Sequence, residues 1–97
     1  MKLSIYCIRD SLTGFMSPVI EQNDAVAMRN FAMACDRFPH EQGASLMKWR
    51  PQDYSFFCLG EFDSDSGKIT PLDVPRFIAS GDSVASKLDA VSEVDES

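Results

Sequence analysis

The chain has 97 residues, of which 44% are hydrophobic and 25% are charged, and this composition is typical of one small globular domain. Its formal net charge of −6 lacks the basic surplus expected of a typical nucleic-acid binder. No apolar run approaches the roughly 20 residues of a membrane-spanning helix, and the N-terminal MKLSIYCIRDSLTG predicts a strand and not a signal peptide. We therefore expect a cytoplasmic protein with no membrane contact.

The charge is unevenly distributed along the chain. Residues 82–97 hold five acids and one base, a net of −4, whereas residues 1–81 hold ten acids and eight bases, a net of −2. The sequence therefore predicts a nearly balanced body followed by an acidic tail.

The first fifth of the chain predicts two antiparallel strands. Residues 2–8 alternate between two faces, as in a half-buried strand, with Leu3, Ile5 and Cys7 on one face and Lys2, Ser4 and Tyr6 on the other. The segment DSLTG, residues 10–14, supplies turn residues. The apolar run 15–20 then returns beside the first strand, and Pro18, which has no N–H, places it at a sheet edge or a strand end.

A helix is expected from Asp24 to Arg37. Asn23 or Asp24 can cap its first turn, and an acid there is favoured by the helix dipole. The apolar side chains follow helical spacing and form one stripe of Ala27, Phe31, Ala34 and Phe38, which is widened by Met28, Ala32 and Cys35. We interpret this stripe as core packing.

Two further strands are expected after the helix. The third, from Tyr54 to Phe62, is apolar on both faces, which favours a central position or a dimer contact. Its alternation places Tyr54, Phe56, Cys58 and Phe62 on one face and Phe57 and Leu59 on the other. The fourth, from Lys68 to Leu72, follows a tight loop. Prolines 71 and 75 are expected to end the regular part, so residues 73–79 are expected to be irregular or a short helix. The fold class is α+β, in the order β-β-α-β-β, with one amphipathic helix packed on a small antiparallel sheet. Residues 1–79 form the predicted domain, and residues 80–97 form an acidic tail, partly disordered or a short helix.

Several chemistries are disfavoured by spacing. The segment Asp63-x-Asp65-x-Gly67 resembles a calcium loop, but glycine falls at position five and position twelve is Val74, so we expect a hairpin loop. The three cysteines are odd in number and lack paired spacing, and the chain has one histidine, so no zinc site, disulfide framework or catalytic pair is indicated. We therefore expect a protein that is not an enzyme, with no cofactor, no metal and three buried cysteines.

One cluster could bind nucleic acid. The segment MKWRPQDY places Lys48, Trp49, Arg50 and Tyr54 close together, and stacking rings combined with cations hold single strands without reading their sequence. Three residues on the first strand and the helix could extend this site, namely Lys2, Tyr6 and Arg29. The alternative is that Trp49 caps the core edge and the cations are solvated, and the residues alone favour this alternative.

The sequence also resembles a known family. The matching features are the Gly14-Phe15 turn, the Asn23-Asp24 helix start and the block LGEFD at residues 59–63, within a resemblance over residues 2–72. They are similar to the small nonstructural protein of gokushoviruses, the tailless single-stranded DNA microviruses of bacteria that include the Chlamydia phages.

The resemblance implies a role and a location. Members are described as binding DNA or as associated with replication, and as absent from the capsid; no catalytic residues come with the resemblance. It implies a non-enzymatic accessory factor in the host bacterial cytoplasm that contacts single-stranded DNA during genome replication or packaging, as a possible homodimer through an exposed strand edge. The alternative is a protein-interaction module that modulates a viral or host replication factor without contacting DNA.

Overall fold

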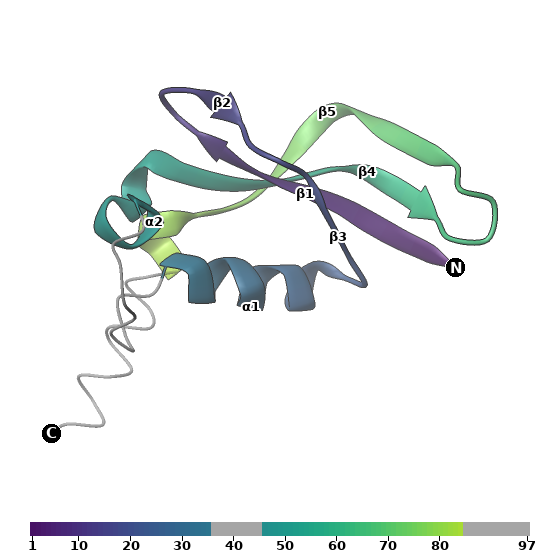
Figure 1. Ribbon diagram of the computed structural model, residues 1–97, viewed down its shortest axis with the longest axis horizontal. Helices are drawn as coiled ribbons and strands as arrows, with labels where there is room; N and C mark the ends of the chain where they lie inside the picture. The colour runs from purple at the N-terminus through teal and green to yellow at the C-terminus, as the bar shows by residue number, and fades with distance from the viewer. Residues whose placement is uncertain (36–45, 85–97) are drawn as a thin grey trace, which may run out of the picture.

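The computed structural model describes residues 1–35 and 46–84. These residues form a twisted antiparallel sheet with one long helix on one side, which confirms the expected α+β class (Figure 1). The elements in chain order are β1 (Lys2–Asp10), β2 (Gly14–Phe15), β3 (Val19–Glu21), α1 (Asp24–Cys35), α2 (Leu46–Trp49), the 3-10 turn η1 (Pro51–Asp53), β4 (Tyr54–Asp63) and β5 (Ile69–Ser80).

Strand β1 lies at the centre of the sheet. Strand β4 pairs with one of its edges, and β5 continues the sheet beyond β4. The other edge of β1 is shared by β2 and β3, so the single return strand expected over residues 15–20 is divided in two. The division includes Pro18, which cannot donate a ladder hydrogen bond.

Helix α1 begins as its sequence predicts. The side chain of Asn23 accepts a hydrogen bond from the backbone N–H of Val26 at 2.9 Å, so Asn23 is the N-cap. Ala27, Phe31 and Cys35 are buried, one helical repeat after another, which confirms the predicted core stripe. The rest of that stripe toward Phe38, like the expected helix end at Arg37, lies outside the described residues.

Strand β5 corrects one prediction. It extends from Ile69 to Ser80 through both prolines, although residues 73–79 were expected to be irregular or helical. An edge strand with no partner on its outer side tolerates residues without an N–H. The register shifts between the pairs Gly60–Pro71 and Cys58–Arg76. Within this shift, residues 72–75 of β5 have no paired residue on β4.

Two glycines meet special requirements around β4. A Cβ on Gly60 would lie 2.4 Å from the carbonyl oxygen of Thr70, so only glycine lets β5 approach this closely. Gly67 has a φ of 77° in the loop between β4 and β5. The backbone N–H of Asp65 donates to the side chain of Asp63 at 2.9 Å. These contacts confirm that residues 63–67 form a hairpin loop closed by its own side chains.

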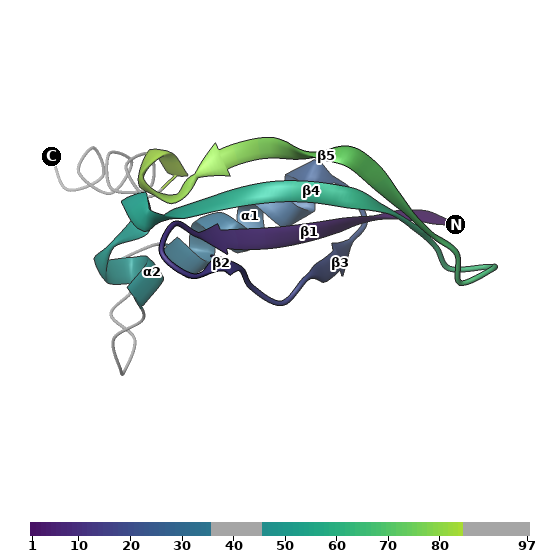
Figure 2. The ribbon, with the colours of Figure 1, turned by 90° about the horizontal axis from the view of Figure 1, so that it is seen from above.

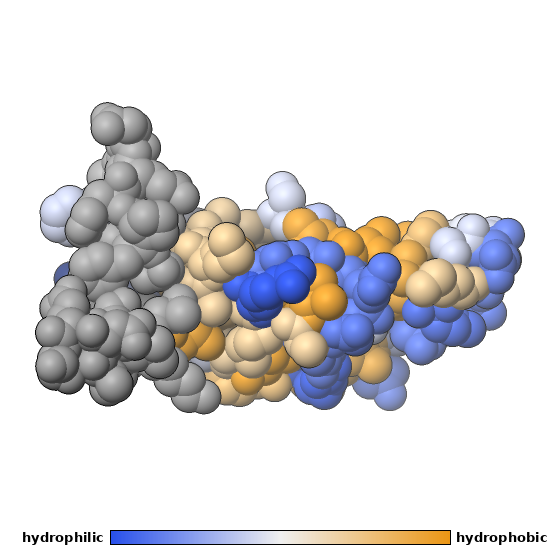
Figure 3. Space-filling model, turned by 90° about the horizontal axis from the view of Figure 1, so that it is seen from below, coloured by the Kyte–Doolittle hydropathy of each residue, from blue (hydrophilic) through white to orange (hydrophobic). Residues whose placement is uncertain are grey.

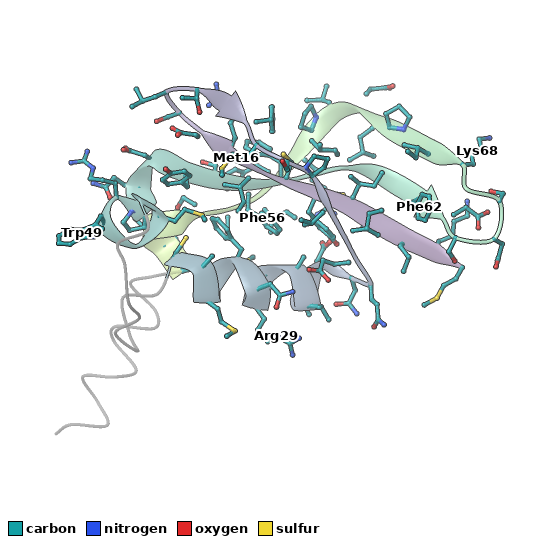
Figure 4. The ribbon with its side chains drawn as sticks, viewed as in Figure 1. Met16, Arg29, Trp49, Phe56, Phe62 and Lys68 are labelled. Carbon is teal, nitrogen blue, oxygen red and sulfur yellow. The ribbon has the colours of Figure 1, made fainter. Side chains whose placement is uncertain are left out.

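The core lies between the sheet and α1. The ring of Phe56 stacks on Phe31 from the helix with centroids 4.8 Å apart and on Tyr6 from β1 with centroids 5.4 Å apart. Figure 4 shows Phe56 pointing from the sheet toward the helix. All three cysteines are buried, as predicted. Residues 81–84 have helical backbone after β5, and Val84 is buried in the same core cluster; residues 85–97 of the expected tail lie outside the described part.

Candidate functional site

The sheet face opposite α1 is the most unusual surface of the described structure. Figure 2 shows this face with the strands in front and the helix behind them. Strand alternation and pairing place a mostly apolar set on it, which we call the open face: Leu3, Ile5, Cys7, Arg9, Phe15, Ile20, Phe57, Phe62, Ile69 and Phe77. No described helix covers this face, although Cys7 within it is buried and its Sγ donates a hydrogen bond to the backbone oxygen of Met16 at 2.9 Å.

Three phenylalanines cross the open face from strand to strand. Phe57 on β4 lies in the middle, with its ring centroid 5.5 Å from Phe15 on β2 and 5.7 Å from Phe77 on β5. The rings meet edge to face, at 70° and 77°. The outer two are 47% and 57% exposed, although phenylalanine is normally buried. We call these three residues the aromatic row.

Charge is unevenly placed across the sheet. Arg9 is exposed and pairs with Phe15 on one side and with Ser55 on the other, so it occupies the open-face position of β1 next to the aromatic row. The four carboxylates at strand-paired positions alternate to the helix side, and they are Asp10, Glu21, Glu61 and Asp63. Asp73 lies in the irregular stretch of β5. A mixed surface is visible on the helix side in Figure 3, where hydrophilic and hydrophobic residues are interspersed.

Both tyrosines that were predicted to contact nucleic acid lie in the protein interior. Tyr6 is 0% exposed and Tyr54 is 5% exposed, so neither ring can stack on a base unless the core opens. Burial raises the pKa of Tyr6 to about 12, with a smaller contribution from its hydrogen bond to Asp24. Burial also raises the pKa of Tyr54. Both tyrosines are therefore structural residues in the native fold.

The remaining predicted contacts are exposed but dispersed. Figure 4 shows Trp49 at one end of the molecule and Arg29 on the side of α1 that faces away from the sheet. Lys2 pairs with Asp63 on β4, beside the hairpin loop at the other end. Arg50 lies next to Trp49, with its Nε 3.5 Å from a carboxylate oxygen of Asp53. Lys48 belongs to α2, and its side chain lies outside the described part. The structure therefore places Lys2 and Arg29 away from Trp49, and Arg50 is the predicted cation whose described side chain lies beside it.

Residues 1–35 and 46–84 hold neither a metal site nor a membrane-spanning helix. No group of three or more histidine, cysteine or acidic side chains there could hold a metal ion. No helix in the same residues is long and apolar enough to cross a membrane. The open face is therefore the strongest candidate site in the described structure.

The fold and the open face define a small α+β protein whose sheet is covered by a helix on one side only. The chain belongs to the Phage ORF5 protein family, whose model matches residues 3–84. The matched range covers all the elements described above except the first residue of β1, and it ends at Val84, which is a member of the core cluster. Comparison with curated proteins and with solved structures gave no significant match.

The aromatic row was not predicted as a site. Phe57 was expected to lie opposite Phe56 on a strand with two apolar faces, and that expectation is confirmed. Phe62 was expected on the face of Phe56, but the register shift between Cys58 and Gly60 places it on the open face with Phe57. The sequence did contain a signal for this site. One predicted helix can cover only one of the two apolar faces of the strand, so the other face had to remain exposed or meet a partner. Phe77 gave no such signal, because prolines 71 and 75 led to the prediction that no strand continues through that segment.

Proposed function

We propose that this phage protein is a non-enzymatic accessory factor of genome replication or packaging in the host bacterial cytoplasm, and that it binds single-stranded DNA through the aromatic row of its open face. The observation that carries the proposal is the aromatic row beside Arg9. Every base has a π-face that stacks on aromatic side chains, and a neighbouring cation attracts the phosphates. An open sheet with exposed aromatic rings is also how the common RNA-binding sheet domain stacks two or three bases.

The charge balance limits the kind of binding that this face supports. A protein of net charge −6 repels nucleic acid at long range, so stacking has to supply most of the affinity. We therefore expect weak binding at low salt, a shallow salt dependence and a preference for single strands, whose bases are free to stack.

The proposal is tested by fluorescence anisotropy with a labelled oligothymidine and its duplex form, across a salt series. Phe77→Ala and Phe15→Ala should each weaken single-strand binding by about tenfold, because one stacking contact contributes about 1–3 kcal/mol. Arg9→Gln should weaken binding less and flatten the salt response. Arg29→Gln is the matched control, because it removes an exposed cation from the outer side of the helix.

Three outcomes would count against the open face as a DNA site. One is the absence of binding at low salt, and another is equal binding by Phe77→Ala and the native chain. The third is a loss on Trp49→Ala without a loss on Phe77→Ala, which would move the site to the end of the molecule that carries α2.

The second candidate is a protein-interaction module that binds a viral or host replication factor. The observation that favours it is the part of the open face away from the aromatic row, where the exposed residues Ile20 and Ile69 are aliphatic and offer no stacking surface. Absence of any DNA binding, together with saturable binding of a phage or host replication protein that Ile69→Thr abolishes, would select this candidate.

A further inference from the structure

We propose that a second copy of this chain covers the open face in solution, and that this dimer and single-stranded DNA exclude one another. The dimer stands independently of the proposed function, whereas the exclusion rests on it. The occupant and the way it docks follow from the exposed apolar area, the charge and the free edge of the sheet.

The open face exposes enough apolar area for a weak interface. Four side chains of the open face are apolar and about half exposed, namely Phe15, Ile20, Ile69 and Phe77. Met16, which follows Phe15 in the chain, is exposed to a similar extent. At roughly 150–200 Å² for each side chain, these five expose on the order of 400–500 Å². The half-buried residues between them, such as Leu3 and Ile5, raise the total toward the roughly 800 Å² that each partner buries in a standard interface. This area favours a weak, concentration-dependent dimer.

The charge pattern favours a copy of the same surface. Alternation leaves Arg9 as the only charged side chain at the strand-paired positions of the open face, and this residue lies at the end where β1 meets β2. A two-fold axis brings the same patch of each copy together, which is favourable when that patch is apolar and unfavourable when it carries many like charges. Two sheets packed in this way lie about 10 Å apart with interleaved side chains.

The edges of the sheet are less suited to association. Strand β5 forms one edge, and Pro71 and Pro75 each remove a backbone donor from its ladder. At the opposite edge β1 is already paired by β2 and β3, which are two and three residues long. Short strands and prolines both protect against edge-to-edge pairing. Stacking face to face is therefore favoured over pairing edge to edge.

A dimer of this kind would cover the aromatic row. Phe77 and Ile69 lie on the same strand and the same face, and a second sheet seated on Ile69 and Ile20 extends over the phenylalanines. DNA would then bind only the monomer. At a protein concentration about ten times the dimer dissociation constant, roughly a fifth of the chain is monomeric, so the apparent DNA affinity falls about fivefold.

The dimer is tested first without DNA, by sedimentation equilibrium of the full chain over a wide concentration range. We expect a dimer that dissociates at micromolar concentrations and tightens as salt rises, because screening reduces the repulsion between two copies of charge −6. The double variant Ile20→Thr with Ile69→Thr should raise the dissociation constant at least tenfold. Val19→Thr is the matched control, because Val19 is 48% exposed and Ile20 is 46% exposed on the same strand, but Val19 pairs with Tyr6 on the helix side.

The exclusion is tested by adding the labelled oligothymidine to the same samples. The double variant should bind DNA more tightly than the native chain at high protein concentration and equally well at low concentration. A monomer at every concentration, or a dimer that the double variant does not weaken, would overturn the dimer. A dimer that binds DNA without dissociating would overturn the exclusion. A dimer in a chain that binds no DNA at all would leave the dimer supported and the proposed function refuted.

Discussion

Neighbouring residues of the same strand lie on opposite faces of the sheet, and the two faces differ in how far they are buried. Phe56 and Phe57 follow one another on β4, yet Phe56 is enclosed by Tyr6 and Phe31 whereas Phe57 contacts the half-exposed rings of Phe15 and Phe77. The covered face holds the core cluster of the described structure, and the open face repeats the same residue chemistry without a covering element. A face that the fold does not need for its own core is available for binding. The following substitutions test whether the two faces differ in their contribution to stability.

The largest expected effect separates the two phenylalanines. Phe56→Ala removes a ring that stacks on two others inside the core, and this should reduce the free energy of unfolding by about 3–5 kcal/mol. Phe57→Ala removes a ring from a face that is already partly solvated, so we expect a loss of about 1 kcal/mol. Urea denaturation of both variants gives the comparison.

Equal losses from these two variants would contradict the contrast between the faces. They would indicate that a second copy or another part of the chain covers Phe57 as completely as α1 covers Phe56. Repeating the Phe57→Ala measurement at several protein concentrations distinguishes these cases, because only a dimer makes the loss depend on concentration.

The sequence predicted the covered face better than the open one. The 3.6-residue spacing of Ala27 and Phe31 identifies the helix and its buried stripe, since that periodicity is local. The two-residue alternation of β1 identifies a strand, but not which of its faces the helix covers. The helix covers the face that carries Tyr6, and Leu3 and Ile5 remain half-buried on the open face. Which face is covered depends on contacts between distant parts of the chain, and no local pattern records them.

The proposed site was hidden for the same reason. Trp49 and Arg50 are adjacent in sequence and so suggested a cluster, whereas Phe15, Phe57 and Phe77 come from three strands and meet only through pairing with β1 and β4. Register of this kind is set by tertiary structure. The prolines of β5 also prevented its prediction from the sequence. Proline is depleted in strands and normally indicates a strand end, although an edge strand accepts it.

The next effect concerns the close contact of β4 with β5. Gly60→Ala would place a Cβ 2.4 Å from the carbonyl oxygen of Thr70, and a backbone atom cannot move away as a flexible side chain would. We expect a loss of about 1–3 kcal/mol, measured by thermal unfolding followed by circular dichroism. The substitution also tests how β5 is placed, since an unchanged melting temperature would mean that the strands lie farther apart.

The third effect appears at alkaline pH and belongs to the covered face. The folded protein raises the pKa of Tyr6 from 10.0 to about 12, so the neutral phenol is favoured more strongly in the folded state than in the unfolded state. Its stabilising contribution is complete below pH 10 and is lost as the pH rises toward 12. Absorbance of the phenolate should show delayed ionisation, and Tyr6→Phe should remove one of the two transitions. Ionisation of both tyrosines near pH 10 would mean that Tyr6 is open to water.

The smallest expected effect is at Asp24, which links the start of helix α1 to two strands of the sheet. Its carboxylate accepts hydrogen bonds from Arg76 on β5, at 3.0 and 3.2 Å, and from the hydroxyl of Tyr6 on β1. The bond from Arg76 is the first cause of the lowered pKa of Asp24, and the bond from Tyr6 is the second. Because the depressed pKa favours the carboxylate in the folded state, its contribution is present above about pH 4 and is lost as the pH falls below that value.

Exposure keeps this contribution small. The side chains of Asp24 and Arg76 are each 51% exposed, so solvent screens the ion pair and Asp24→Asn should cost only about 0.5–1 kcal/mol at neutral pH. The difference between native and variant should shrink as the pH falls from 5 toward 3, which urea denaturation across this range would show. The control is Asn23→Ala, which removes the N-cap at a cost of about 1 kcal/mol that does not vary with pH, because an amide has no charge to lose. A difference for Asp24→Asn that stays constant with pH would show that the carboxylate acts through packing, and the helix would then be held on the sheet by its apolar stripe alone.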